Sequence, residues 1–165
     1  MYRFVFLLVA LLLPVCGWAQ QPVPSKAPSN QTGKDVAKAY VPGLEQFMNM
    51  ILIEHNKLWF AARSHNWPLA DYELGEIKEI MGDVQDLVPT FKNLPLADML
   101  DAVVTKEIAA LEKSIEAKDY KGFMAGYDRL TQACNACHQS TGNGFVVIKR
   151  PTQPAFTNQD YRPSK

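Results

Sequence analysis

The central region of the chain repeats apolar side chains every three or four positions, and this helical period constrains its fold most strongly. Prolines and short polar stretches divide the region into four amphipathic segments. The first ends near Asn66, and the second starts after Pro68. The third follows Pro95, and the fourth begins after Asp119, a residue suited to capping a helix. Four such segments with short links predict an all-α fold, an antiparallel four-helix bundle over residues 35–139.

One face of each segment is apolar and predicts the core. In the first two segments this face comprises Tyr40, Leu44, Phe47, Met48, Ile51, His55, Leu58, Trp59 and Ala62, followed by Leu69, Tyr72, Glu73, Ile77, Ile80, Met81, Val84 and Leu87. The third segment also carries charged residues that we expect on a solvated face, namely Lys106, Glu107, Glu112, Lys113, Glu116 and Lys118.

The N-terminal residues have the layout of a secretory signal peptide. Arg3 supplies the positive start, and an almost unbroken apolar run covers residues 4–15, which is short for a membrane span. Cys16 is an alternative lipoprotein cysteine, but the residue before it is not the small one expected there. We therefore predict that residues 1–19 are a signal peptide cleaved after Ala19. The mature protein is then exported to the periplasm and has no membrane span.

The segments that flank the helical region differ from it in composition. Residues 20–34 are rich in Pro, Ser, Gln and Asn, which predicts a flexible lead-in. At the other end, residues 140–165 contain a Gly-rich break, the apolar stretch 145–148 and several prolines. This composition predicts an irregular, Pro-rich C-terminal tail that packs on the bundle. Lys and Arg number 17, as do Asp and Glu, so no charge surplus points to nucleic acid.

The motif Cys134-Asn135-Ala136-Cys137-His138 carries the chemistry of the chain. Two thiols three positions apart can each add to a vinyl group of haem and form a thioether, and the adjacent imidazole can bind the iron. The signal is strong because the whole chain has three Cys and three His. Haem attachment of this kind occurs outside the cytoplasm, in agreement with the predicted export. We predict one covalently attached haem c, with Cys134 and Cys137 as attachment residues and His138 as an iron ligand.

The cysteine pair has three other interpretations: a structural disulfide, a thioredoxin-like redox pair and half of a zinc site. The redox pair needs a βαβ framework that the helical pattern lacks. Zinc needs further ligands, and the remaining histidines, His55 and His65, do not have the spacing of a second ligand pair. A disulfide leaves His138 unexplained. These considerations favour haem.

With these residues in place, the chain resembles the class II cytochromes c, the cytochrome c′ family, which carry one haem-attachment motif near the end of the fourth helix of a bundle. Most c-type cytochromes of the other large class have this motif near the N-terminus. The resemblance covers the bundle and implies that Cys134 and Cys137 are the thioether cysteines and that His138 is the proximal iron ligand. The chain departs from the family in its apolar, Pro-rich tail.

The sixth iron ligand is sought on the first helix, because the first and fourth helices are neighbours in such a bundle. By the register of the cytochrome c′ family, the position over the iron falls near residues 48–52. Ile51 there would leave the iron open, whereas Met48 would bind it through a thioether. We predict His55 as the ligand and Met48 as the alternative, since an unpaired buried imidazole is disfavoured. A core histidine bonded to a neighbour such as Glu73 is a further interpretation of His55.

Other aromatic and basic residues have simpler roles. Trp59, Trp67 and Tyr72 are predicted to pack around the first interhelical turn, with a haem-facing aromatic wall as the alternative. Lys149 and Arg150 are predicted to lie on the surface, with contact to the haem propionates as the alternative.

Three functions fit these residues. The first is electron transfer by an exported monohaem c-type cytochrome that meets a redox partner protein, with a monomer and a homodimer both compatible with the sequence. The second, implied by the resemblance to cytochrome c′, is binding of nitric oxide or carbon monoxide at a five-coordinate haem. The third is an exported helical module without haem. The sequence has no visible nucleophile–base pair, carboxylate dyad or phosphate loop, so it does not predict an enzyme.

Overall fold

The computed structural model describes residues 40–164. The predicted signal peptide (residues 1–19), the lead-in (residues 20–34) and the first residues of the helical region lie outside this part of the chain. Within it, the prediction of an all-α fold is confirmed, because the regular elements are helices and no strand is formed. These elements are α1 (Leu44–Arg63), α2 (Trp67–Leu87), α3 (Leu96–Val103), the π-helical turn η1 (Val104–Ile108), α4 (Ala109–Glu116) and α5 (Tyr120–Ser140).

The ends of α1 and α2 follow local sequence signals. Gly43 caps α1, and the Gln46 side chain accepts a hydrogen bond from the Gly43 backbone N–H at 2.8 Å. The Asn66 side chain caps α2 by accepting from the backbone N–H of Leu69. Tyr40 was expected on the apolar face of the first helix, but it precedes α1 and is exposed. The Gly43 cap starts the helix one turn later than the apolar pattern predicts.

The third predicted helix is one continuous helical run with a π-helical turn, η1, in its middle. Thr105 donates its hydroxyl to the carbonyl of Asp101, one turn earlier. A π-turn holds an extra residue, so the side chains after it are rotated relative to an unbroken α-helix. Glu107, expected on the solvated face, is therefore buried, and its carboxylate lies 3.3 Å from Nε of Arg129 on α5.

Helix α2 lies at the centre of the helix contacts, since it packs against α1, α3 and α4, while α4 also packs against α5. By contrast, α1 contacts α5 only sparsely. The core between these helices is built from Phe47, Leu58, Leu74, Ile77, Val84, Ile108, Leu111, Phe123, Tyr127 and Leu130, all nearly or fully buried. No helix within residues 40–164 combines the length and the hydropathy that crossing a bilayer requires.

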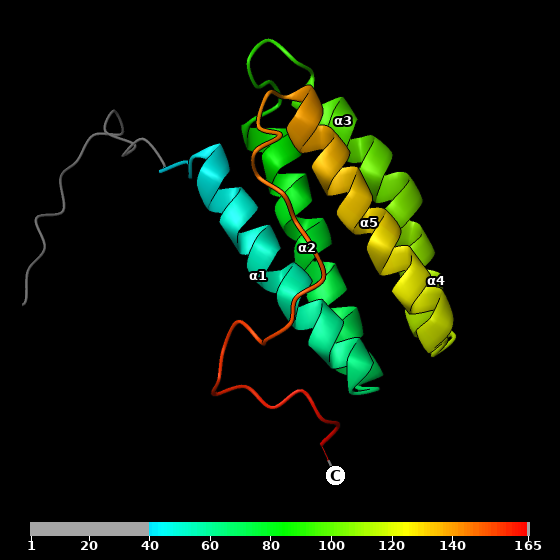
Figure 1. Ribbon diagram of the computed structural model, residues 1–165. Helices are drawn as coiled ribbons and strands as arrows, with labels where there is room; N and C mark the ends of the chain where they lie inside the picture. The colour runs from blue at the N-terminus through cyan, green and yellow to red at the C-terminus, as the bar shows by residue number, and fades with distance from the viewer. Residues whose placement is uncertain (1–39, 165) are drawn as a thin grey trace, which may run out of the picture. The chain divides into compact units, whose positions relative to one another are not determined.

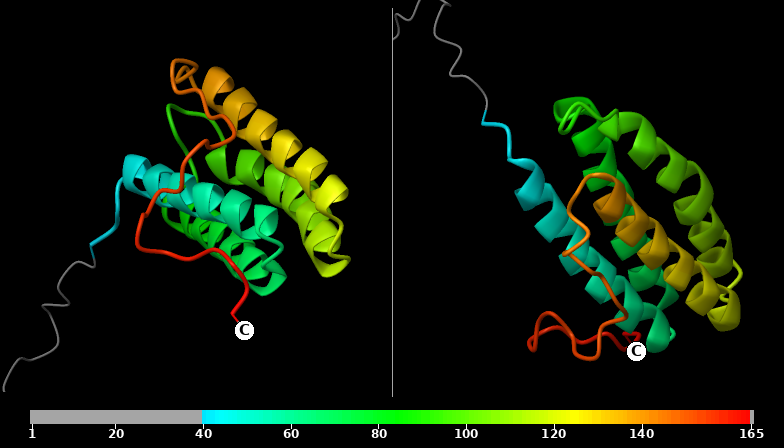
Figure 2. Two further views of the ribbon diagram at one scale, coloured as in Figure 1. Left: turned by 60° about the horizontal axis from the view of Figure 1, so that its bottom comes forward. Right: turned by 45° about the horizontal axis from the view of Figure 1, so that its top comes forward.

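The tail forms no regular secondary structure and runs back along the helices after α5 ends (Figures 1 and 2). Polar side chains of the helices hold its backbone. Asn56 on α1 donates to the carbonyl of Gln153 at 3.1 Å and accepts from the N–H of Ala155 at 2.8 Å. Near the end of the tail, Tyr161 is buried and its ring packs against Phe60 of α1. The tail is thus fastened to α1 at two separate places.

Candidate functional site

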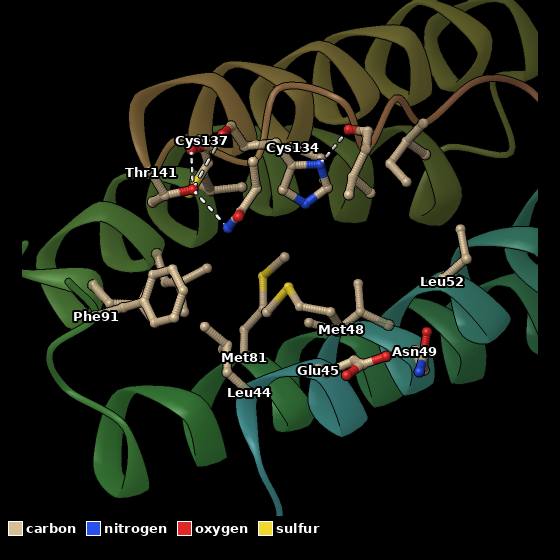
Figure 3. A pocket seen from close by; sticks show the side chains of 18 of the residues that line it. Leu44, Glu45, Met48, Asn49, Leu52, Met81, Phe91, Cys134, Cys137 and Thr141 are labelled. Carbon is tan, nitrogen blue, oxygen red and sulfur yellow. Dashed lines mark hydrogen bonds between the residues drawn. The ribbon is translucent and has the colours of Figure 1, made fainter.

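A cavity of about 500 Å³ lies where α1 and α5 make few contacts with each other (Figure 3). Its size is within the range of about 300–1,000 Å³ typical of small-molecule and cofactor sites. The walls are predominantly apolar, with polar side chains interspersed. They are formed by Leu44, Glu45, Met48, Asn49, Ile51, Leu52, His55, Met81, Phe91, Leu96, Leu100, Val103, Cys134, Cys137, His138, Thr141, Asn143, Phe145, Val146 and Ile148.

The three residues of the predicted haem-attachment motif all line this cavity. Cys134, Cys137 and His138 lie in the last two turns of α5, where a spacing of three and four residues places side chains on one helix face. Both thiols are free in the structure. The sequence pattern of α5 therefore brings the two cysteines and the histidine to one wall of one cavity.

The tail contributes a hydrogen bond to His138. The ring nitrogen Nδ1 lies 2.8 Å from the carbonyl oxygen of Val146. A carbonyl oxygen only accepts, so Nδ1 carries the proton and donates it. In the neutral ring Nε2 is then unprotonated, with its lone pair available to a metal ion. This is the tautomer that an iron-ligating histidine requires.

Burial makes the two thiols weakly acidic. It raises the pKa of Cys134 to about 11, and it also raises the pKa of the less buried Cys137. Since the thiolate is the reactive form of cysteine, both residues are poor nucleophiles in the folded chain. In the haem-free folded chain they are accordingly poorly suited to thiol exchange.

The wall opposite the cysteines comes from α1 and α2. Figure 3 shows the side chains of Met48 and Met81 extending into the space that faces Cys134 and Cys137, with Phe91 at one end. The sequence pattern points to Met48 as a site residue but indicates no such role for Met81 or Phe91. The apolar stripe placed Met81 in the core, whereas Phe91 lies in the link after α2, outside any helical period.

His55 also lines the cavity, but both of its ring nitrogens have partners. Nε2 lies 2.9 Å from Oγ1 of Thr131, and Nδ1 lies 2.8 Å from the hydroxyl of Tyr127. Burial lowers the pKa of His55 to about 4, so the ring is neutral at pH 7, with one donor and one acceptor nitrogen. The partner suggested from the sequence, Glu73, instead lies 2.7 Å from Lys57. His55 is thus a paired core histidine in this structure.

Other residues singled out from the sequence lie away from the cavity lining. Trp59 is buried and packs against Tyr127 and Phe123, as core packing predicts. Arg150 binds the carboxylate of Asp128 through two nitrogens, each 2.6 Å from an oxygen, and its guanidinium lies over the Trp59 ring. Tyr72, expected on the apolar face of its helix, is exposed. These residues do not form an aromatic wall of the cavity.

A haem group fits the residues present. The cavity is largely apolar, it has two cysteines and a histidine on one wall, and the histidine has its Nε2 lone pair free. A zinc site fits less well, because residues 40–164 contain no group of three or more His, Cys, Asp or Glu placed to hold a metal ion. Cys134, Cys137 and His138 would hold the haem, and Met48, Ile51 and Met81 line the same cavity from the other helices.

Comparison with known proteins gives no match to a protein-family model, a curated protein or a solved structure. The functional conclusion therefore follows from the residues of the cavity themselves.

Proposed function

We propose that the chain is an exported c-type cytochrome that carries electrons through one haem, covalently attached at Cys134 and Cys137 and ligated by His138. The observation that carries the proposal is the convergence of these residues on one apolar cavity of about 500 Å³, with the His138 ring in the tautomer that leaves Nε2 free. Haem c bound there would accept and release one electron at its iron.

The chain's own residues would supply the surroundings of this haem. The apolar walls would exclude water, which stabilises the ferrous state relative to the ferric state by disfavouring the extra positive charge. The Val146 carbonyl, as an acceptor from His138, acts in the opposite direction by making the imidazole a stronger electron donor. These two effects would shift the reduction potential in opposite directions.

We propose that the chain is a member of the class II cytochromes c, as its resemblance to them implies. We propose that α1, α2, the run from α3 to α4, and α5 form an antiparallel four-helix bundle with the Pro-rich tail packed on it. The location in the periplasm, the removal of residues 1–19, a redox partner protein and a homodimer belong to the same proposal.

Binding of nitric oxide or carbon monoxide is the second candidate function, and the pairing of His55 favours it. Both ring nitrogens of His55 are engaged by Tyr127 and Thr131, so this residue can bind iron only if one hydrogen bond breaks. Met48 could bind iron without breaking a hydrogen bond. If Met48 also fails to bind, the apolar Ile51 offers no ligand in its place, and the iron would remain able to bind a gas.

Two spectra test these proposals. The protein should be expressed with its leader in a host that attaches haem c in the periplasm, then purified and reduced. A c-type spectrum that carbon monoxide leaves unchanged supports electron transfer by a six-coordinate haem. A spectrum that shifts with carbon monoxide supports gas binding. A colourless protein contradicts both and leaves the helical module without haem.

A further inference from the structure

Residues 145–148 of the tail are held largely by polar contacts of their backbone. Phe145 and Val147 are exposed to 83% and 71%, so their side chains contribute little hydrophobic stabilisation. The backbone of this stretch nevertheless lies against α5, because the Val146 carbonyl accepts from His138 and the backbone of Ile148 is bonded to Asn135. These hydrogen bonds account for the course of the tail past the cavity.

Asn135 binds the backbone of Ile148 on both sides. Its Nδ2 donates to the Ile148 carbonyl at 2.8 Å, and its Oδ1 accepts from the Ile148 N–H at 2.7 Å. A planar side-chain amide can form such a pair because it presents a donor and an acceptor side by side, as a peptide group does. We call these two bonds the Asn135 clasp.

The place of Asn135 in the motif makes the clasp informative. Asn135 stands between the two cysteines, where attachment of haem requires no particular side chain. Its side-chain amide binds the backbone of Ile148. Ile148 lies two residues beyond Val146, whose carbonyl is the hydrogen-bond partner of His138. One short motif therefore contains the histidine and the residue that fixes the partner of that histidine.

We propose that Asn135 is a positioning residue for His138. The clasp on Ile148 holds the Val146 carbonyl where it accepts from Nδ1, so that the tail fixes the tautomer and the direction of the ring. Ligating histidines generally donate their second nitrogen to such an acceptor, which raises the basicity of the ligand. The effect on an iron ligand rests on the proposed function. The positioning of the His138 ring by Asn135 does not depend on it.

The chain supplies a matched control. Asn56 holds the tail by the same chemistry, since its side chain bonds the carbonyl of Gln153 and the N–H of Ala155. It does so from α1, at a place remote from His138 in the sequence of the tail. Asn56→Ala therefore removes two hydrogen bonds of the same kind without touching the clasp.

The test follows the Nδ1 proton of His138 by NMR in the purified, ¹⁵N-labelled full chain, with or without haem as isolated. We expect Asn135→Ala to speed exchange of this proton with solvent at least about tenfold, because a net hydrogen-bond contribution of about 1.4 kcal/mol corresponds to that factor. Asn56→Ala should leave the exchange rate unchanged. Asn135→Asp, which keeps the acceptor and loses the donor, should give an intermediate rate.

Unchanged exchange in Asn135→Ala overturns the proposal, and so does equal acceleration by Asn56→Ala, which would assign the effect to the tail as a whole. If Asn135→Ala does not fold, the comparison of Asn135→Asp with Asn56→Ala decides in the same way. A colourless protein in which the clasp variants still change the exchange rate would contradict the proposed function while supporting the role of Asn135.

Discussion

The imidazole of His55 stacks on the ring of Tyr127, with their centroids 4.3 Å apart, and the Tyr127 hydroxyl lies 2.8 Å from Nδ1. The same hydroxyl donates to the backbone carbonyl of His55, also at 2.8 Å. Thr131 is the partner of Nε2, so all polar atoms of the buried His55 ring have hydrogen-bond partners. A buried imidazole without such partners would lower the stability of the fold. It links α1 to α5 beside the cavity.

Removal of the Tyr127 hydroxyl tests this cluster. Tyr127→Phe leaves the buried Nδ1 and the carbonyl of His55 short of a partner, so we expect the free energy of unfolding to fall by about 1–3 kcal/mol. Urea unfolding followed by circular dichroism measures the change. Tyr72→Phe, at an exposed position, should leave the stability within about 0.5 kcal/mol. A loss no larger in Tyr127→Phe than in this control would contradict the role of the hydroxyl.

The sixth iron ligand is tested by two substitutions. The sequence-based prediction is His55, and it requires the ring to release Thr131 or Tyr127, whereas the Met48 side chain already extends into the cavity. If His55 binds iron, His55→Ala turns the ferric spectrum high-spin and Met48→Ala does not. The reverse result identifies Met48. If neither substitution changes the spectrum and the starting protein binds carbon monoxide, the iron is five-coordinate and gas binding is the function.

Glu73 gives a dependence of stability on pH. Burial, opposed by the neighbouring Lys57, raises the pKa of this carboxyl from 4.5 to about 7. The folded state therefore holds a proton that the unfolded chain releases between about pH 4.5 and pH 7, and this contribution to stability is lost as pH rises through that window. Glu73→Gln removes the titration. Its stability relative to the parent should increase from pH 5 to pH 8, by up to about 3 kcal/mol.

Urea unfolding at several pH values measures this difference. Glu79→Gln, at an exposed position on the same helix, serves as the matched control for the substitution itself. The effect of Glu73 is the part of the pH-dependent difference that exceeds this control. A stability difference for Glu73→Gln that is constant from pH 5 to pH 8 would show that the carboxyl titrates alike in the folded and unfolded states.

The sequence predicted those features that depend on neighbouring residues, and it missed those that depend on distant ones. Apolar period and capping residues gave the helical segments, and the motif spacing gave one face for Cys134, Cys137 and His138. The hydrogen-bond partners of His55 could not be predicted from local sequence patterns, because Thr131 lies 76 residues further along the chain. Nor could the burial of Glu107, which depends on the π-turn and on Arg129 from another helix.

The reactivity of Cys134 tests whether its thiol is buried in the haem-free chain. With its pKa raised from 9.0 to about 11, Cys134 has about 100-fold less thiolate at pH 8 in the folded chain than in the unfolded chain. We expect its alkylation by iodoacetamide, followed by peptide mass spectrometry, to slow by about that factor on removal of urea. Equal alkylation rates with and without urea would contradict the burial of this thiol.

The central claim is that one haem is bound covalently at the end of α5, and mass spectrometry tests it most directly. The protein matured in the periplasm should be digested and the peptide that contains Cys134, Cys137 and His138 weighed. The account predicts that this peptide carries the mass of one haem, and that Cys134→Ser combined with Cys137→Ser removes it. A peptide with two unmodified cysteines, from cells that attach haem to another c-type cytochrome, would contradict the account.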